Sequence, residues 1–305
     1  MPLASRRLGR AFAPSHVTGL FTPSLAARDP RARGSVGAGL VLDVGVGATA
    51  EWVPGPRRRV RLIGPPRARL EISEEVARRL MAGRSGWLTV RLEHSLPIGQ
   101  GFGASAAGAL ATGLAVTSAL GLARSRAVEV AHLAELFGRG GLGGVAAILG
   151  GGLELRLRAG IPPFGRVERR AVRADLIVGI VGPPLPSTRV LGERSPADRF
   201  ARGSELLKDL ARHPDLVHFW SAAGTFGESV GLASPRLRTV LGGLRRRGLS
   251  ATQAMFGQSF LASRPEGAEG LRTVRWLEAG GVRCWEVKVA RRGARTAPST
   301  PSRRP

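Results

Sequence analysis

Glycine, serine and other small residues dominate one stretch of the chain, residues 96–111. Gly99, Gly101 and Gly103 alternate along it, and Ser105 follows two residues later. Glycine lets the backbone turn its N–H groups toward an anion, because no Cβ blocks the approach. A helix directly after the loop would point its unpaired amides and the positive end of its dipole at the same place. This stretch therefore predicts a phosphate-binding loop, in which the Ser105 hydroxyl could bind a phosphate oxygen or a magnesium ion.

Two other glycine motifs fit this stretch less well. No Lys-Ser/Thr pair follows the last glycine, which argues against a P-loop. The spacing from Gly101 to Ala106 matches the dinucleotide-binding fingerprint, but Pro97 separates it from the strand predicted over residues 87–92, which that fingerprint should follow directly. A flexible loop before a buried helix remains open on these residues alone.

A longer pattern around this loop resembles the second motif of the GHMP kinases, the family of galacto-, homoserine, mevalonate and phosphomevalonate kinases. The loop reads Gly-Phe-Gly-Ala-Ser-Ala-Ala, where family members carry Gly-Leu-Gly-Ser-Ser-Ala-Ala or a close variant. Finer details of the loop and of residues 13–21 resemble one branch, the archaeal pantoate kinases. The resemblance implies ATP and Mg²⁺ as cofactors. It also implies the phosphate-binding residues Pro97, Gly99, Gly101, Phe102, Gly103, Ala104, Ser105 and Ala106.

Further segments, in the family's order, extend the resemblance over most of residues 11–290. In the first motif, Ser15, His16 and Thr18 are expected beside the acceptor substrate. Turn chemistry and a core histidine would explain them equally well. Arg156 follows a glycine run, as in the pantoate kinases, and could bind the substrate carboxylate through two parallel hydrogen bonds. An outward-facing strand residue is the alternative for Arg156.

The resemblance also implies a metal site and a third motif. Glu135 precedes the catalytic loop and is the expected magnesium ligand beside Ser105, since a carboxylate and a hydroxyl are hard oxygen ligands that suit this ion. The alternative for Glu135 is an exposed charge on a helix. The third motif contributes Gln253, Met255 and Gly257, which are expected near the phosphate loop.

The chain departs from the pantoate kinases at residues 138–145. Where that branch has Thr-Gly-Leu-Gly-Asp-Val, Gly140 replaces the threonine and Gly144 replaces the aspartate. The aspartate is the expected counterpart of the acid that deprotonates or orients the acceptor hydroxyl. Glycine cannot act as a base, and losing a general base typically removes a factor of about 10²–10⁴ in rate. The catalytic residue is therefore unassigned. A substitute carboxylate such as Asp43 is conceivable, although nothing in the sequence places it.

Composition limits the class of protein. The chain of 305 residues carries 46 Lys+Arg against 22 Asp+Glu, a net charge of +24, with 43% hydrophobic residues and the single cysteine Cys284. A single cysteine excludes an intrachain disulfide, and no apolar run reaches the length of a membrane span. We expect a cytoplasmic protein with no membrane partner. The arginines are scattered and aromatic residues amount to 5%, so solvated surface explains the charge better than nucleic-acid binding does.

The resemblance implies an α+β fold in two domains. A ribosomal-protein-S5-like nucleotide-binding domain is expected over residues 11–163, and a ferredoxin-like domain over residues 164–290. A basic N-terminal extension, residues 1–10, and a disordered basic tail, residues 291–305, are expected to flank them.

Apolar spacing and capping residues predict the helices. They are expected at residues 74–81, 104–120, 125–137, 197–211, 215–232, 235–247 and 266–279. Residues 34–52 alternate around glycines and predict two strands with a turn between them, and residues 57–66 predict a proline-broken connection.

The implied reaction is ATP-dependent phosphorylation of pantoate to 4-phosphopantoate, in the biosynthesis of coenzyme A. The partners would be pantoate and ATP, and a homodimer is left open. Three alternatives also stay open. They are a GHMP kinase for another small hydroxylated acceptor of the homoserine or mevalonate type, a weakened or inactive descendant because of Gly144, and a basic nucleic-acid-binding protein.

Overall fold

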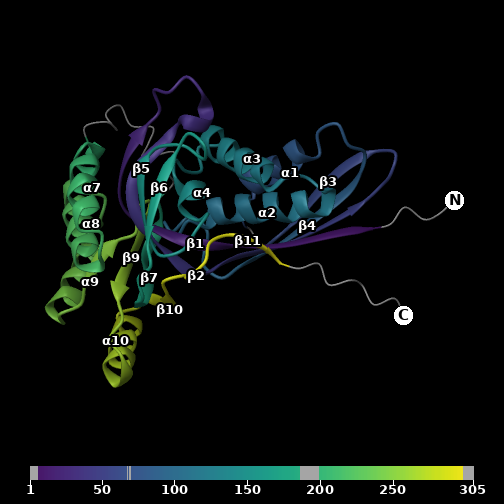
Figure 1. Cartoon of the computed structure of the whole chain (residues 1–305). Coiled ribbons are helices and arrows are strands. Elements are labelled where there is room, and N and C mark those ends of the chain that lie inside the picture. The colour runs from purple at the N-terminus through teal and green to yellow at the C-terminus, as the bar shows by residue number, and fades with distance from the viewer. Residues whose placement is uncertain (1–5, 67, 69, 186–198, 298–305) are drawn as a thin grey trace.

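The computed structural model describes residues 6–66, 68, 70–185 and 199–297. A long, strongly curved sheet forms the first half of the molecule, with helices packed on one face (Figure 1). Its seven strands are β1 (Arg7–Ser24), β2 (Gly34–Val53), β3 (Arg58–Ile63), β4 (Gly86–His94), β5 (Leu153–Arg158), β6 (Arg166–Arg170) and β11 (Arg295–Ala297). The main order is β11-β1-β2-β4-β3, and β5 joins β2 to β6. The β3–β4 pair is parallel and the other pairs in this sheet are antiparallel.

Helix α2 is the central helix on this sheet. The helices here are α1 (Glu71–Leu80), α2 (Ala104–Leu120), α3 (Arg124–Phe137), α4 (Gly144–Ala147) and the short 3₁₀ helix η1 (Pro30–Ala32). Nearly every residue of α2 is buried, because α2 lies between β1, α1 and α3. Small residues make this close approach possible: a Cβ added at Gly9 of β1 would clash with the carbonyl of Ala115 in α2. The sheet and its helices therefore fix the position of the first turn of α2.

A second sheet and its helices form the other half. Its four strands are β7 (Asp175–Pro184), β8 (Ala251–Gln253), β9 (Gly257–Ser263) and β10 (Arg283–Lys288), in the antiparallel order β10-β7-β9-β8. The helices are α7 (Arg202–Arg212), α8 (Leu216–Val230), α9 (Pro235–Arg246) and α10 (Gly267–Ala279).

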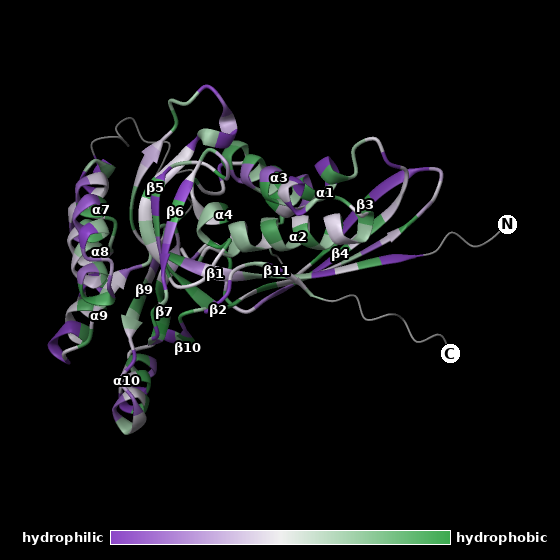
Figure 2. Cartoon of the chain, in the orientation of Figure 1, coloured by the Kyte–Doolittle hydropathy of each residue, from purple (hydrophilic) through white to green (hydrophobic). Residues whose placement is uncertain are grey.

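Apolar side chains join the two halves. Helices α7 and α8 contact β1, and Phe21 of β1 packs against Phe200 and Phe226 with ring centroids 4.6 and 5.7 Å apart. Apolar residues cover the inner faces of these helices and polar residues their outer faces (Figure 2). Within the described residues, no helix is both long and apolar enough to cross a membrane.

Capping and spacing predicted the helices well. Helix α2 has the predicted bounds, and α3, α8, α9 and α10 begin or end within two residues of theirs. The Asp215 side chain accepts from the His218 amide, and Ser234 caps α9 by accepting from the Leu237 amide. Helix α7 begins at Arg202, and residues 197–198 of the predicted helix lie outside the described residues.

Two predictions are wrong, one for residues 34–52 and one for residues 57–66. Residues 34–53 form one strand, β2, because its pairing with β1 runs from Gly34 to Trp52 with two register shifts but no turn. The glycines allow close strand contact instead of turning the chain: a Cβ at Gly45 would clash with the Ala13 carbonyl. Residues 58–63 form β3 rather than a connection, since the prolines flank this strand and leave its pairing with β4 intact.

The structure also corrects the expected domain limits. Strand β1 already begins at Arg7, inside the expected extension 1–10, and the Arg7 guanidinium lies 5.4 Å from the centre of the Trp52 ring. In the expected disordered tail 291–305, β11 pairs with β1, and the Arg295 guanidinium covers the ring of Phe12 at 4.7 Å. Strand β6 pairs with β5, so the first sheet continues beyond residue 163 to Arg170. Residues 1–5 and 298–305 lie outside the described residues.

Candidate active site

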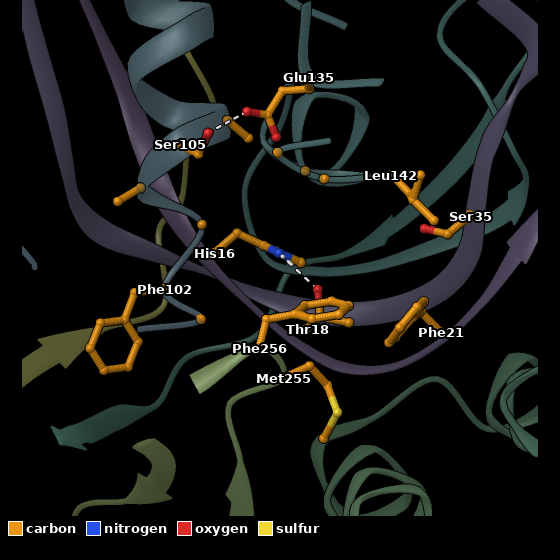
Figure 3. A pocket seen from close by; sticks show the side chains of 18 of the residues that line it. His16, Thr18, Phe21, Ser35, Phe102, Ser105, Glu135, Leu142, Met255 and Phe256 are labelled. Carbon is orange, nitrogen blue, oxygen red and sulfur yellow. Dashed lines mark hydrogen bonds between the residues drawn. The ribbon is translucent and has the colours of Figure 1, made fainter. Parts of the chain in front are cut away.

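Most of the predicted site residues meet in a cavity between the two halves, shown from close by in Figure 3. The cavity has a volume of about 150 Å³. It lies where the loop before α2, strands β1 and β2, the segment before α4 and the turn between β8 and β9 come together. Its walls are formed by His16, Thr18, Phe21, Ser35, Gly99, Gly101, Phe102, Gly103, Ala104, Ser105, Ala106, Glu135, Gly140, Gly141, Leu142, Gly143, Gly144, Arg156, Leu185, Met255 and Phe256.

The glycines of the loop have the backbone angles that the phosphate-loop prediction requires. Gly99, Gly101 and Gly103 have φ of +81°, +75° and +67°, a region that other residues rarely adopt. Gly103 is the N-cap of α2, so the first amides of this buried helix face the cavity at Ala104, Ser105 and Ala106. A helix N-terminus attracts anions through these amides and through its dipole. The loop and the helix start therefore have the geometry that the predicted phosphate site requires.

Neighbouring segments hold this loop on both sides. The amide of His16 donates to the carbonyl of Phe102 at 3.1 Å, which ties the loop to β1. The Phe102 ring is 1% exposed and meets Trp285 edge to face at 6.4 Å. A Cβ at Gly101 would clash with the carbonyl of Met255, so glycine is needed there for contact with the third motif. The loop is fixed before any ligand binds.

Glu135 and Ser105, the two predicted magnesium ligands, lie in contact beside the loop. The Ser105 hydroxyl donates to Oε1 of Glu135. Glu135 is 4% exposed, so the alternative of an exposed helix charge is wrong. Burial raises the pKa of Glu135 to about 7, although the hydrogen bond from Ser105 opposes this. Burying an ionised carboxylate without a partner costs free energy, and a bound cation would offset this cost.

The glycines after α3 leave room for this carboxylate. A Cβ at Gly140 would lie 2.5 Å from Oε1 of Glu135, and one at Gly141 would lie 2.9 Å from Oε2. Glycine in place of the family's threonine at residue 140 therefore fits the observed position of Glu135. Within the described residues, no group of three or more His, Cys, Asp or Glu side chains could hold a metal ion. A magnesium ion here would need nucleotide oxygens and water to complete its ligands.

A buried polar cluster forms the opposite wall. His16 Nε2 lies 2.9 Å from Oε1 of Glu154, and Arg156 Nη1 donates to the same oxygen. Thr18 Oγ1 lies 3.5 Å from His16 Nδ1. Arg156 is 2% exposed, so it is not an outward-facing strand residue. Glu154 is not among the residues predicted from the sequence, although residues two apart on a strand share one face, and this spacing links Glu154 to Arg156.

A second arginine adds positive charge behind this cluster. Arg169 of β6 donates to the carbonyls of Ala147 and Ala146 at 2.7 and 2.9 Å, at the end of α4. Burial lowers the pKa of Arg169, while the charge of Glu154 raises it. Two guanidiniums against one carboxylate leave this wall with a net positive charge even when His16 is neutral. A substrate carboxylate would balance that charge.

Four of the predicted site residues do not line the cavity: Ser15, Pro97, Gln253 and Gly257. Ser15 and Gln253 are buried just behind its walls, and the Gln253 amide donates to the carbonyl of Gly257 at 3.0 Å. A Cβ at Gly257 would clash with the Gln100 carbonyl of the loop. Five lining side chains were missed by the sequence analysis, namely Phe21, Ser35, Leu142, Leu185 and Phe256.

Gly144 lines the cavity at the start of α4, where the related kinases have aspartate. A Cβ at this position would lie 2.6 Å from the Ala106 Cβ, so a larger residue needs a local shift. Asp43 does not replace the missing carboxylate. It is exposed on β2, away from the cavity walls, and accepts from the amide of Lys288 at 2.8 Å.

Several known proteins are similar to this chain in sequence. The family description "GHMP kinases N terminal domain" matches residues 71–152. A pantoate kinase from Thermococcus kodakarensis is 32% identical over 237 residues, which cover 76% of this chain and 79% of the relative. A pantoate kinase from Methanospirillum hungatei is 32% identical over 254 residues, 81% and 84% of the two chains.

Solved structures confirm the fold. A "phosphotransferase related to CoA biosynthesis pathway" superimposes with a TM-score of 0.83 at 26% identity and covers 95% of this chain and 98% of its own. Mevalonate kinase from L. major, solved with R-mevalonate, gives a TM-score of 0.67 at 15% identity, with 95% and 98% covered. The α+β fold expected from the sequence is thereby confirmed as that of the GHMP kinases.

Proposed function

The chain belongs to the pantoate kinases of the GHMP kinase family, and we propose that it transfers the γ-phosphoryl group of ATP to the 4-hydroxyl of pantoate. One observation carries the proposal beyond the family resemblance. A single cavity places the phosphate loop and the Ser105–Glu135 pair opposite the buried cationic wall around Arg156. A phosphate donor and a carboxylate-bearing acceptor could therefore bind face to face.

The phosphate side is formed by the loop and the first turn of α2. We propose that the amides from Gly101 to Ala106 bind the phosphates of ATP, as expected where glycines precede a helix N-terminus. Ser105 and Glu135 would hold Mg²⁺, which supplies charge neutralisation for the transferring phosphoryl group. Phosphoryl transfer depends mainly on positioning and electrostatics, so a prebuilt loop accounts for a large part of the catalysis.

The acceptor side is formed by β1, β2 and β5. Arg156 has one Nη donating to Glu154, while its Nε is buried without a hydrogen-bond partner among the described residues. A buried unpaired donor costs free energy, and a ligand oxygen would satisfy it. We propose that this edge of the guanidinium receives the pantoate carboxylate. His16 and Thr18 would then face the hydroxyl groups of the acceptor.

The test is ADP release by the purified chain with Mg-ATP, with and without D-pantoate. We expect turnover that depends on pantoate and stops when Mg²⁺ is chelated. Homoserine and mevalonate, offered at the same concentration, should give little turnover, because homoserine carries an ammonium group beside its carboxylate and mevalonate has a different carbon skeleton. Turnover with one of these and none with pantoate would refute the acceptor assignment.

A further inference from the structure

His16 lies in the cavity wall, on the proposed acceptor side. Its imidazole points into the cavity from β1, toward Thr18 (Figure 3). Gly144, at the start of α4, has no side chain for this purpose. Of the residues that line the cavity in the described part of the chain, His16 and Glu135 alone can accept a proton near neutral pH. Glu135 is already assigned to the metal.

The hydrogen bonds of His16 determine which ring nitrogen carries the proton. Nε2 meets Oε1 of Glu154, an oxygen that also accepts from Arg156. A carboxylate paired with a guanidinium only accepts hydrogen bonds, so the proton of the neutral ring is on Nε2. Nδ1 is then unprotonated. Its partner in the described chain is the Thr18 hydroxyl at 3.5 Å, the outer limit of a hydrogen bond, so a closer donor can take its place.

We propose that His16 is the catalytic base of this chain and that Glu154 is the positioning residue which holds its ring in the required tautomer. The inference rests on the proposed pantoate kinase function, because it concerns the acceptor in that reaction. His16 would then accept the proton that the family resemblance assigns to an aspartate at the position of Gly144.

The step balances without a further reactant. The acceptor oxygen forms a bond to the γ-phosphorus while the bond from that phosphorus to the β,γ-bridging oxygen breaks. The hydroxyl proton moves to Nδ1 of His16, and the Nε2 proton stays in the hydrogen bond to Glu154. ADP leaves with the bridging oxygen and its electron pair. The imidazolium afterwards releases its proton to solvent.

The charges around His16 suit this cycle. Burial is the largest influence and lowers the pKa of His16, the hydrogen bond and charge of Glu154 raise it, and the charges of Arg156 and Arg169 lower it further. The ring is therefore neutral before the reaction, and Glu154 stabilises the cation that forms. Gly39 of β2 leaves the necessary space, since a Cβ there would clash with the imidazole.

The first variant is His16→Asn, which keeps a donor for Glu154 but has no basic nitrogen. We expect kcat to fall by about 10²–10⁴-fold, while the Kd for ATP and the KM for pantoate change by less than about threefold. The acid limb of the kcat–pH profile should disappear. The matched control is His132→Asn, which removes another buried imidazole, bonded to the Pro30 carbonyl outside the cavity. This control should keep the wild-type kcat and profile.

The second variant, Glu154→Gln, separates positioning from simple structural support. The glutamine amide can donate to Nε2 and so favour the tautomer that carries the proton on Nδ1, which cannot accept the hydroxyl proton there. The neutral amide also cannot stabilise the imidazolium that forms. We expect a lower kcat and a displaced acid limb, with partial recovery in Glu154→Asp. A purely structural residue would change thermal stability and leave the pH profile of the remaining activity unchanged.

The outcomes separate this inference from the proposed function. A wild-type chain without pantoate-dependent turnover would overturn both. An active wild type whose His16→Asn variant keeps kcat within about threefold, with the same pH profile, would overturn the inference alone. If His16→Asn does not bind ATP and has failed to fold, ¹⁵N NMR of histidine-labelled wild type decides instead. The Nε2–H tautomer at neutral pH supports the inference, and an Nδ1–H tautomer or an imidazolium refutes it.

Discussion

Replacing Glu135 with glutamine keeps the shape of the side chain and removes its charge. The carboxyl is 4% exposed and its pKa is raised from 4.5 to about 7 by burial. A shift of this size corresponds to about 3 kcal/mol by which the folded apo chain disfavours the ionised form. Glutamine avoids this cost, because its amide is neutral at every pH. We therefore expect Glu135→Gln to stabilise the apo chain at neutral and alkaline pH.

The sign follows from comparing the folded and unfolded chains. Below pH 4.5 the carboxyl of Glu135 is protonated in both the folded and the unfolded chain, so its ionisation does not affect the stability of the wild type there. As the pH rises to about 7, the unfolded chain loses the proton while the folded chain keeps it, and the wild type loses stability. Above pH 7 the loss is complete. The stability advantage of the variant should thus grow by about 3 kcal/mol between pH 4.5 and pH 7.5.

The assay is urea unfolding across this pH range, first with EDTA and then with Mg-ATP. With EDTA the advantage of Glu135→Gln should grow with pH. With Mg-ATP it should reverse, because the wild type gains ligand stabilisation that depends on the carboxylate. Glu129→Gln on the same helix is the control, since Glu129 is only partly buried beside Arg126 at 3.4 Å and should change stability little. An advantage that does not vary with pH would refute the reasoning about burial, and a missing reversal would refute the metal role.

Two further substitutions test the two walls of the cavity. Gly101→Ala and Gly121→Ala place alanine at φ of +75° and +67°, but only the first would clash with a neighbour, the Met255 carbonyl. Isothermal titration should show at least about tenfold weaker ATP binding for Gly101→Ala and wild-type binding for Gly121→Ala, and equal affinities would contradict the tight-loop argument. Arg156→Lys should raise the KM for pantoate by about 10–100-fold, because lysine cannot bind Glu154 and a substrate carboxylate in the same planar geometry. Arg158→Lys, at the exposed end of the same strand, should leave the KM for pantoate unchanged. Steady-state kinetics of the two variants would test this difference, and equal KM values would contradict it.

The sequence alone was enough to predict the glycine loop and the helix that follows it. Its determinants are local: glycines at fixed spacing, a serine and a run of small residues produce a loop and a helix within twenty residues. Positive φ at three alternating glycines leaves few other conformations, so the sequence pattern and the loop geometry correspond closely. The burial of Glu135 was less predictable, because it depends on how α3 packs against α2 and on the glycines that follow.

The acceptor side depends on contacts distant in sequence. His16 and Glu154 are separated by 138 residues, and they meet because β2 pairs with β1 on one side and with β5 on the other. Glycine-rich β2 was predicted as two strands because glycine usually marks turns. Here Gly37 and Gly39 serve instead to admit the side chains of Arg156 and His16. A single sequence does not distinguish a glycine that turns the chain from one that makes room for a neighbour.

Strand β6 contributes to the proposed acceptor side through Arg169. Arg169 on this strand bonds the end of α4 through two carbonyls, and its charge acts on Glu154 and on His16. The same residue therefore holds the helix that begins at Gly144 and helps to keep the proposed base neutral. The domain boundary expected at residue 163 would have placed Arg169 in a different domain from both α4 and His16. The groups that act on His16 lie on β5 and β6, so the proposed proton transfer would depend on these two strands as well as on β1, which carries His16.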